Sequence, residues 1–263
     1  PQIPLLINKT NNPAVRILIE TTGSKSPLYL YQVFSTISKK SFTSLFSMRC
    51  FYQYLSPDFS DKSQFGFDIS VQQEKICIAG NLKLKEGKNY LWLATQLSEN
   101  AELSEKIIFT IDSIKTNDSM VHLSPPQRPT ELRTGIAVRK HNDDAVDTSR
   151  IPAITTTDKG TLIAVFDIRR NNSKDLQDDI DVGMMRSIDK GKNWEFMKII
   201  MDMKTWGNKS EEENGIGDPA ILFDTKTNTL WAAASWHHGN KGKIAYHSSQ
   251  PGLEPDETSQ LIL

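Results

Sequence analysis

The sequence predicts an all-β protein, with a β-sandwich first and a second β domain after it. Short apolar or alternating runs recur along the chain, and groups of turn-forming residues separate them. Beyond residue 150 the pattern is strand, turn, strand, turn, with no convincing helical periodicity. A proline-rich segment near 124–129 divides the two parts.

The first 124 residues fit a β-sandwich. Turns such as Thr22-Gly23-Ser24 and Glu86-Gly87-Lys88 separate short strands at the spacing that sandwiches use. The strands are expected at residues 15–20, 28–34, 75–79, 90–95 and 106–111. The run 45–55 (LFSMRCFYQYL) fits a strand pair or a helix. Trp92 fits either a core residue or an exposed platform for a sugar.

Prolines at 125, 126 and 129 cannot lie in a central strand, so we expect a linker there and a second domain over 125–263. Strands are expected at 135–140, 161–167, 181–186, 220–223, 229–235 and 243–247. Such a series is typical of four-stranded propeller blades. At about 40–45 residues a blade, residues 127–263 allow three blades at most. Because an open propeller leaves a strand edge unpaired, we expect the chain to be part of a longer protein.

Composition excludes several classes of function. The formal net charge is −1, from 31 basic and 32 acidic side chains, which argues against a nucleic-acid partner. No apolar run approaches the roughly 20 residues of a membrane span, so none is expected. Cys50 and Cys77 fit one disulfide or two buried thiols, and without a CxxC pair a zinc site is not expected. The chain opens without the basic and apolar start of a signal peptide, which processing would also remove.

Two motifs carry the functional information. Residues 187–194 read SIDKGKNW, close to the S-x-D-x-G-x-T-W turn called the Asp box, with Asn193 where Thr or Ser is usual. Residues 150–152 read RIP and resemble the (F/Y)RIP motif of bacterial sialidases, in the same order along the chain. By this resemblance the chain is similar to a Bacteroides-type exo-α-sialidase (neuraminidase). A lectin-like sandwich would precede the first blades of a six-bladed propeller, and the Asp box would be structural.

Arg150 is the first candidate site residue. Pro152 fixes the backbone that follows it, which holds the arginine in an extended segment. A guanidinium donates two parallel hydrogen bonds to a carboxylate. The resemblance implies that Arg150 binds the carboxylate of sialic acid.

Asp175 is the candidate general acid and base, on a loop that follows a strand ending in D-x-R. In the resembled family an Asp at this spacing protonates the leaving oxygen and then activates water. Arg169 resembles a further basic residue beside the sugar, and Arg170 replaces it if the register slips by one. The neighbouring aspartates also fit a solvated loop or a calcium site.

Asp218 and Trp236 complete the candidate set. Asp218 precedes a proline and resembles the family's D-P turn, which implies that it accepts hydrogen bonds from the sugar's O4 hydroxyl and amide N–H. Trp236 fits a contact with the N-acetyl methyl group, or simply the core. His237 and His238 point to opposite sides of a strand, so we expect no shared metal.

The resemblance implies a glycoside hydrolase that releases terminal sialic acid from glycoproteins, glycolipids and mucin, with retention through a tyrosine nucleophile. That tyrosine, its glutamate partner and two further arginines are expected outside this chain, in the missing part of the propeller. No cofactor and no metal are expected, and the protein is expected to be exported to the periplasm, the cell surface or the medium. The alternatives are a glycan-binding adhesion protein on an Asp-box propeller and a trans-sialidase.

Overall fold

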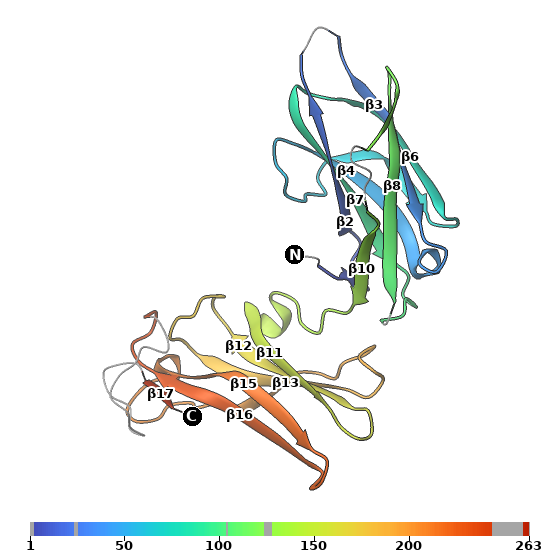
Figure 1. Cartoon of the computed structure of the whole chain (residues 1–263). Helices are drawn as coiled ribbons and strands as arrows, with labels where there is room; N and C mark the ends of the chain where they lie inside the picture. Colours follow the sequence, from blue (N-terminus) through green and yellow to red (C-terminus); the bar gives the residue numbers. More distant parts are fainter. Residues whose placement is uncertain (1–2, 24–25, 104, 124–127, 244–259, 263) are drawn as a thin grey trace. The chain divides into compact units, whose positions relative to one another are not determined.

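The structure is a computed structural model, and it describes residues 3–23, 26–103, 105–123, 128–243 and 260–262 (Figure 1). It divides into two compact units, Pro1–Ala137 and Val138–Leu263. Both are built of strands, and the helical segments among the described residues are short 3₁₀ turns at Phe42–Ser44, Asp143–Ala145 and Glu211–Glu213. The predicted all-β class is therefore confirmed.

The first unit is a sandwich of two sheets (Figure 1). One sheet has the order β1 (Leu5–Leu6), β10 (Thr130–Gly135), β8 (Lys106–Thr116), β3 (Tyr29–Ile37) and β6 (Lys75–Lys83), with β9 (Met120–His122) also pairing with β8. The other has the order β2 (Asn12–Thr21), β7 (Gly87–Leu97), β4 (Leu45–Tyr54) and β5 (Gln64–Ser70). Inward side chains of both sheets form one core that includes Leu30, Ile78, Leu91 and Phe109.

All five strands predicted for the first domain are present, and the ambiguous run 45–55 is the single strand β4. It lacks a clean alternation because both of its faces are covered. Met48 faces the core, whereas Phe51 packs edge-on against Phe59 at 5.8 Å between ring centroids. Phe59 also packs edge-on against Trp92, at 5.8 Å, so Trp92 is half-buried beneath this segment.

The boundary between the two units lies thirteen residues after the predicted one. The strand expected at 135–140 is replaced by β10 at Thr130–Gly135, which pairs with β8 and so extends the sandwich. Leu132 and Thr134 alternate inward from it and are buried. Residues 124–127 of the expected linker lie outside the described residues.

The second unit contains two antiparallel meanders, as predicted for propeller blades. The first sheet runs in the order β11 (Thr148–Thr156), β12 (Leu162–Arg169), β13 (Ile180–Ser187) and β14 (Lys198–Met201). The second runs β15 (Asn214–Asp224), β16 (Thr229–His238) and β17 (Gln260–Ile262). β15 packs across β11, β12 and β13, which places the two sheets face to face. The strand predicted at 243–247 lies, apart from Lys243, outside the described residues.

Both cysteines are free thiols, so the disulfide alternative is wrong. Cys50 lies in β4 and Cys77 in β6, and these strands belong to different sheets. Burial raises the pKa of the Cys50 thiol, which keeps it protonated and unreactive. The pKa of Cys77, which is half-buried, is raised for the same reason.

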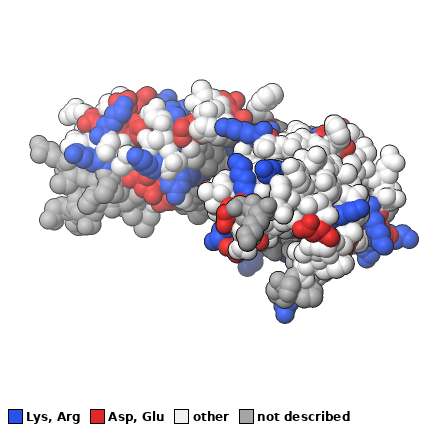
Figure 2. Space-filling view, turned by 90° about the horizontal axis from the view of Figure 1, so that it is seen from above, with Lys and Arg blue, Asp and Glu red and all other residues white. Residues whose placement is uncertain are grey.

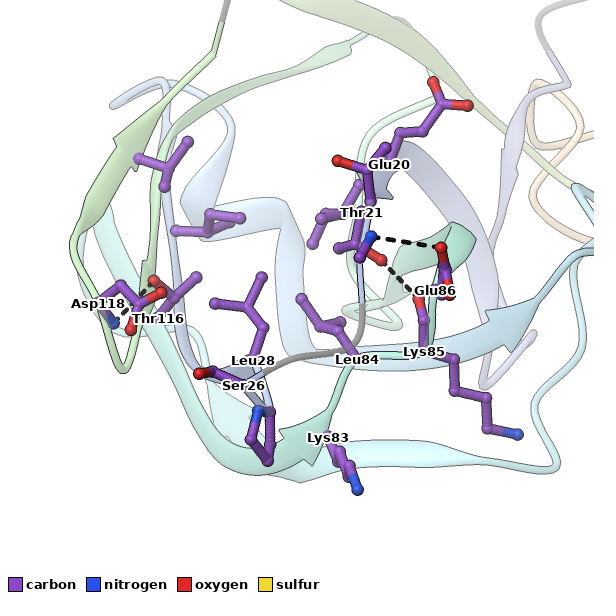
Figure 3. A pocket seen from close by; sticks show the side chains of 16 residues that line it. Glu20, Thr21, Ser26, Leu28, Lys83, Leu84, Lys85, Glu86, Thr116 and Asp118 are labelled. Carbon is purple, nitrogen blue, oxygen red and sulfur yellow. Dashed lines mark hydrogen bonds between the residues drawn. The ribbon is translucent and has the colours of Figure 1, made fainter.

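The sandwich also holds a cavity of about 570 Å³ at one end (Figure 3). Residues after β2, before β3 and around the β6–β7 turn line it. The Thr21 hydroxyl donates to the Lys85 carbonyl at 2.6 Å, and the Gly23 N–H donates to Glu86 at 3.3 Å (Figure 3). Acidic and basic side chains are both among the residues that line the cavity, for example Glu20, Lys83 and Asp118.

The charged side chains are mixed over the surface. Figure 2 shows Lys and Arg interspersed with Asp and Glu on the visible face, in keeping with the net charge of −1. In the described ranges, no helical segment has the length and apolar character required to cross a bilayer.

Gly66 and Gly80 mark a close crossing of β5 and β6. A Cβ on Gly66 would lie 2.2 Å from the Ala79 carbonyl oxygen, and one on Gly80 would lie 2.7 Å from the Phe65 ring. Gly66 also has φ +72, a left-handed conformation that side chains disfavour. This glycine therefore lets the edges of the two sheets approach each other.

We expect Gly66→Ala to lower the free energy of unfolding by about 3 kcal/mol more than Gly23→Ala does. Gly23 has φ +83 but no atom within 4 Å of the added Cβ, so it controls for backbone strain alone. Urea unfolding followed by tryptophan fluorescence measures both losses. Equal losses of unfolding free energy in the two variants would show that the close approach of β5 and β6 does not determine the cost of Gly66→Ala.

Candidate functional site

Arg150 and Asp218 lie at equivalent β-bulges in the first strand of each sheet. In β11 the pairing register shifts between Arg150 and Ala153, and in β15 it shifts between Gly217 and Ala220. Each bulge reads X-Pro-Ala-Ile, and X has a left-handed φ in both: 50° at Ile151 and 51° at Asp218. The proline has no N–H for the ladder, so an edge strand with a bulge is where it fits.

Three of the predicted site residues come together beside the first bulge. Arg150 Nη1 donates to Asp175 Oδ1 at 2.9 Å, and Arg169 Nη1 donates to the same oxygen at 2.6 Å. The same two nitrogens also donate to the carbonyls of Ser173 (2.9 Å) and Lys174 (2.8 Å). Arg169 is 2% exposed whereas the Asp175 side chain is 58% exposed, so a fixed arginine faces an accessible carboxylate.

This arrangement favours the ionised form of Asp175. The hydrogen bond from Arg169 is the main cause that lowers the pKa of Asp175, and the charge of Arg150 adds to it. A carboxylate in this state accepts hydrogen bonds but has no proton to donate.

Asp167 is the residue of this cluster to which the sequence assigned no role. It is fully buried at the end of β12, and its Oδ2 accepts from Arg169 Nε at 3.2 Å and Nη2 at 2.8 Å. Its Oδ1 accepts the backbone N–H of Asp218 at 2.8 Å. Burial raises the pKa of Asp167, while the hydrogen bonds from Arg169 and Asp218 oppose that rise. The D-x-R pattern in the sequence could have indicated that Asp167 contacts Arg169, because residues two apart on a strand lie on the same face.

The loop that carries Asp175 is closed at its base by ion pairs. Arg170 pairs with Asp179 at 2.7 Å and with Asp181, and Asn171 donates to Asp178 at 2.9 Å. Arg169, and not Arg170, therefore faces Asp175. Within the described part of the chain, no group of three or more His, Cys, Asp or Glu is arranged to hold a metal ion.

The far side of this loop is anchored to the second sheet. Gln177 Oε1 lies 2.8 Å from His237 Nδ1, and both side chains are fully buried. The Gln177 backbone exchanges hydrogen bonds with Lys243 and Gly242, both at 2.8 Å. Burial lowers the pKa of His237 to about 4, so this imidazole is neutral at physiological pH.

Trp236 lies in a packed aromatic group. Its ring meets Trp206 edge-on at 4.9 Å and lies 5.1 Å from His238, and its Nε1 donates to Asn214 Oδ1 at 3.3 Å. It is 9% exposed, which leaves little surface for a ligand. Its contact with an N-acetyl methyl group stays a prediction. Asp218, by contrast, is exposed.

The Asp box forms the structural turn that its sequence predicts. Gly191 N–H donates to Ser187 Oγ at 2.9 Å, and Trp194 Nε1 donates to the Gly191 carbonyl at 3.1 Å. Asn193 replaces the usual Thr and donates to Asp189 through its backbone (2.9 Å) and its side chain (2.7 Å). Ser187 pairs with the first residue of β12, whereas Arg169 is the last, so the turn lies at the opposite end of the sheet from Asp175.

The comparisons with known proteins agree with this arrangement. Residues 59–120 match the N-terminal domain of BNR-repeat neuraminidase. A sialidase of Bacteroides fragilis (strain YCH46) is 38% identical over 209 residues, which cover 79% of this chain and 38% of that protein. A sialidase of Micromonospora viridifaciens is 28% identical over 112 residues, which cover 43% of this chain and 16% of that protein.

A solved structure extends the match to both units. The structure titled Hadza microbial sialidase Hz136 superposes with a TM-score of 0.83 at 30% identity, covering 99% of this chain and 55% of that one. The chain is therefore related to the bacterial sialidases, as the two motifs predicted, and it combines their N-terminal sandwich with part of a propeller. It spans 38% of the length of the Bacteroides relative.

Asp181 makes the stability of this unit depend on pH. Burial, reinforced by the charge of Asp179, raises the pKa of Asp181 from 3.8 to about 6. The folded state therefore binds this proton more tightly than the unfolded state does, and the contribution of Asp181 to stability falls as pH rises from 3.8 to 6. The lowered pKa of His237 acts in the opposite direction, so the effect of Asp181 is isolated by comparing a variant with the unmodified protein.

We expect the unfolding free energy of Asp181→Asn, relative to that of the unmodified protein, to rise by about 2 kcal/mol between pH 4 and pH 7. Asp158→Asn, on an exposed turn, is the control, and its unfolding free energy relative to the unmodified protein should not change with pH. Urea denaturation at several pH values measures these free energies. A difference between Asp181→Asn and the unmodified protein that does not change with pH would contradict the raised pKa of Asp181.

Proposed function

We propose that this chain carries the carboxylate-binding and proton-donating part of the active site of a glycoside hydrolase that releases terminal sialic acid. The observation that supports it most strongly is the convergence of Arg150 and Arg169 on a single carboxylate oxygen, Asp175 Oδ1. Two guanidinium groups that bind an internal carboxylate are suited to the carboxylate of sialic acid. The relatedness to sialidases supports the same substrate.

In the proposed reaction the substrate carboxylate takes the place of Asp175 on the two arginines. Asp175 then loses the hydrogen bonds that lower its pKa and gains a nearby negative charge, so its pKa rises and it takes up a proton. The glycosidic C–O bond breaks as that proton passes to the leaving oxygen, while the tyrosine oxygen expected outside this chain bonds to the sugar carbon. The ionised Asp175 next removes a proton from water, and the water oxygen bonds to the sugar carbon as the bond to the tyrosine oxygen breaks.

The sugar's other polar groups would face the second bulge. The exposed Asp218 carboxylate is fixed by its backbone hydrogen bond to Asp167 and is suited to accept from the O4 hydroxyl and the amide N–H. Trp236 is proposed to meet the N-acetyl methyl group with the edge that it leaves exposed. The covalent step is proposed to retain configuration through a tyrosine nucleophile, because a second carboxylate would be repelled by the substrate's own.

The proposed substrates are sialylated glycoproteins, glycolipids and mucin. Such substrates lie outside the cell that makes the enzyme, so we also propose export to the periplasm, the cell surface or the medium. Cell fractionation with an antibody to the chain tests this, and a purely cytoplasmic signal would refute it.

Arg150→Ala is expected to weaken the binding of N-acetylneuraminate about tenfold or more, because it removes a charged hydrogen-bond donor to the carboxylate. Chemical-shift titration of the purified protein measures the affinity. Arg186→Ala is the matched control, since Arg186 lies in the same sheet but pairs with Glu195 at its surface. Equal affinities in the two variants would refute the carboxylate site.

Asp175→Ala is expected to tighten N-acetylneuraminate binding severalfold, since it frees both arginines from their internal partner. In the full-length protein, which supplies the expected nucleophile, the same substitution should reduce hydrolysis of sialyllactose far more than hydrolysis of an aryl sialoside, whose leaving group needs no proton. Weaker binding of N-acetylneuraminate would contradict the displacement of Asp175 by the ligand, and equal losses of hydrolysis on both substrates would contradict the role of Asp175 as the acid. Tight binding with no hydrolysis by the full-length unmodified protein would favour a glycan-binding protein.

A further inference from the structure

We propose that Asp167 is a positioning residue that holds Arg169 and Asp218 in one fixed arrangement, so that both act on the same ligand; this rests on the proposed function. Asp167 is fully buried and does not reach solvent. Its Oδ2 accepts from the Arg169 side chain, and its Oδ1 accepts from the Asp218 backbone N–H.

The contacts with Arg169 determine which edge of the guanidinium is available. Nε and Nη2 both donate to Asp167 Oδ2, at 3.2 and 2.8 Å. Nη1 is left to donate outward, to Asp175 Oδ1 at 2.6 Å. Because Arg169 is 2% exposed, it has no solvent to replace a lost partner. Asp167 therefore fixes the direction in which Arg169 offers its remaining donor.

The contact with Asp218 stabilises a strained part of the backbone. The bulge between Gly217 and Ala220 removes the Asp218 N–H from the strand ladder, and φ is 51° there. An unpaired N–H near the interior is costly, and a left-handed φ is unfavourable for a residue with a side chain. Asp167 Oδ1 accepts that N–H at 2.8 Å from the neighbouring sheet. The carboxylate thus joins the two bulges.

The fold itself does not require a carboxylate at this position. Asp167 pairs with Arg150 in the first sheet, just as Ser235 pairs with Gly217 in the second. Ser235 is also buried, so the same place in the second meander accommodates a small neutral residue. The carboxylate is therefore better explained by the two groups that it holds than by the architecture of a blade.

The first test needs no ligand. In Asp167→Asn we expect the Asp218 amide to exchange with solvent at least tenfold faster, and the Arg169 Nε–H resonance to shift or broaden, because an amide group is neutral and accepts through one oxygen only. Hydrogen exchange and heteronuclear NMR on the whole chain measure both. Unchanged protection and an unchanged Arg169 resonance would overturn the proposal.

The second test is a binding cycle with N-acetylneuraminate. Asp167→Asn is expected to weaken binding about ten- to a hundredfold in the unmodified protein, and much less in the Arg169→Ala background. Additive losses would indicate a merely structural role and overturn the proposal. Glu195→Gln is the matched control and should leave binding unchanged, since Glu195 pairs with Arg186 of the same sheet at its surface.

Asp167→Ser supplies a second variant should Asp167→Asn fail to fold, because the second sheet accommodates serine at the equivalent position. Either folded variant with the affinity of the unmodified protein would overturn the inference. If the unmodified protein binds no N-acetylneuraminate, the proposed function fails, while the exchange and resonance measurements still decide whether Asp167 positions Arg169 and Asp218.

Discussion

The ion pair between Asp167 and Arg169 lies where the two sheets of the second unit meet, and the candidate site is built outward from it. Both side chains are almost fully excluded from water, so neither charge would be tolerated alone. The pair is tolerated because both groups are hydrogen-bonded. Asp167 accepts three hydrogen bonds, two from the Arg169 side chain and one from the Asp218 N–H, and Arg169 donates a further one to Asp175. Removing Arg169 would leave the buried Asp167 charge uncompensated, and removing Asp167 would leave Arg169 with Asp175 as its remaining ion-pair partner.

The repeated bulge explains how one fold presents different chemistry at equivalent places. Both meanders interrupt their first strand with X-Pro-Ala-Ile, and both place X at a left-handed φ. In the first sheet the candidate site residue precedes X and is Arg150, whereas in the second it is X itself, Asp218. Bulges turn side chains out of the alternating pattern of a strand, which frees these two from the packing between sheets.

The ion pairs of Asp175 with Arg150 and Arg169 are the part of the structure on which the proposed reaction depends. Asp175 accepts from both Arg150 and Arg169 and so balances part of their charge. Its loop is held at the base by Arg170 and at the far side by Gln177, while the Asp175 side chain itself remains exposed. In the proposed reaction an anionic ligand would compete with this one side chain and would leave the rest of the loop anchored. The pKa of that side chain would follow the exchange.

Some features followed from local sequence alone. The Asp box is one, since Ser187, Asp189 and Asn193 satisfy a turn within seven residues of one another. The five sandwich strands with clear apolar runs are another, and so is the approach of Arg150 and Asp175, whose spacing a resemblance could transfer. Each depends on contacts between near neighbours in sequence or on a recognisable motif.

Other features depended on partners far away in the chain. Strand β10 belongs to the sandwich because it pairs with β8, and β4 fitted a strand pair or a helix in sequence because Phe59 covers its outer face. Cys50 and Cys77 are free thiols in strands of different sheets, which their sequence positions do not indicate. The Asp167–Asp218 contact joins residues 51 positions apart. The sequence by itself thus determined the all-β class, the order of the two parts and the residues that carry the motifs. Only the tertiary structure decided the strand register, the burial of each side chain and the partner of each charge. The reason is that hydrogen bonds between strands and between sheets are long-range contacts, which no local pattern encodes.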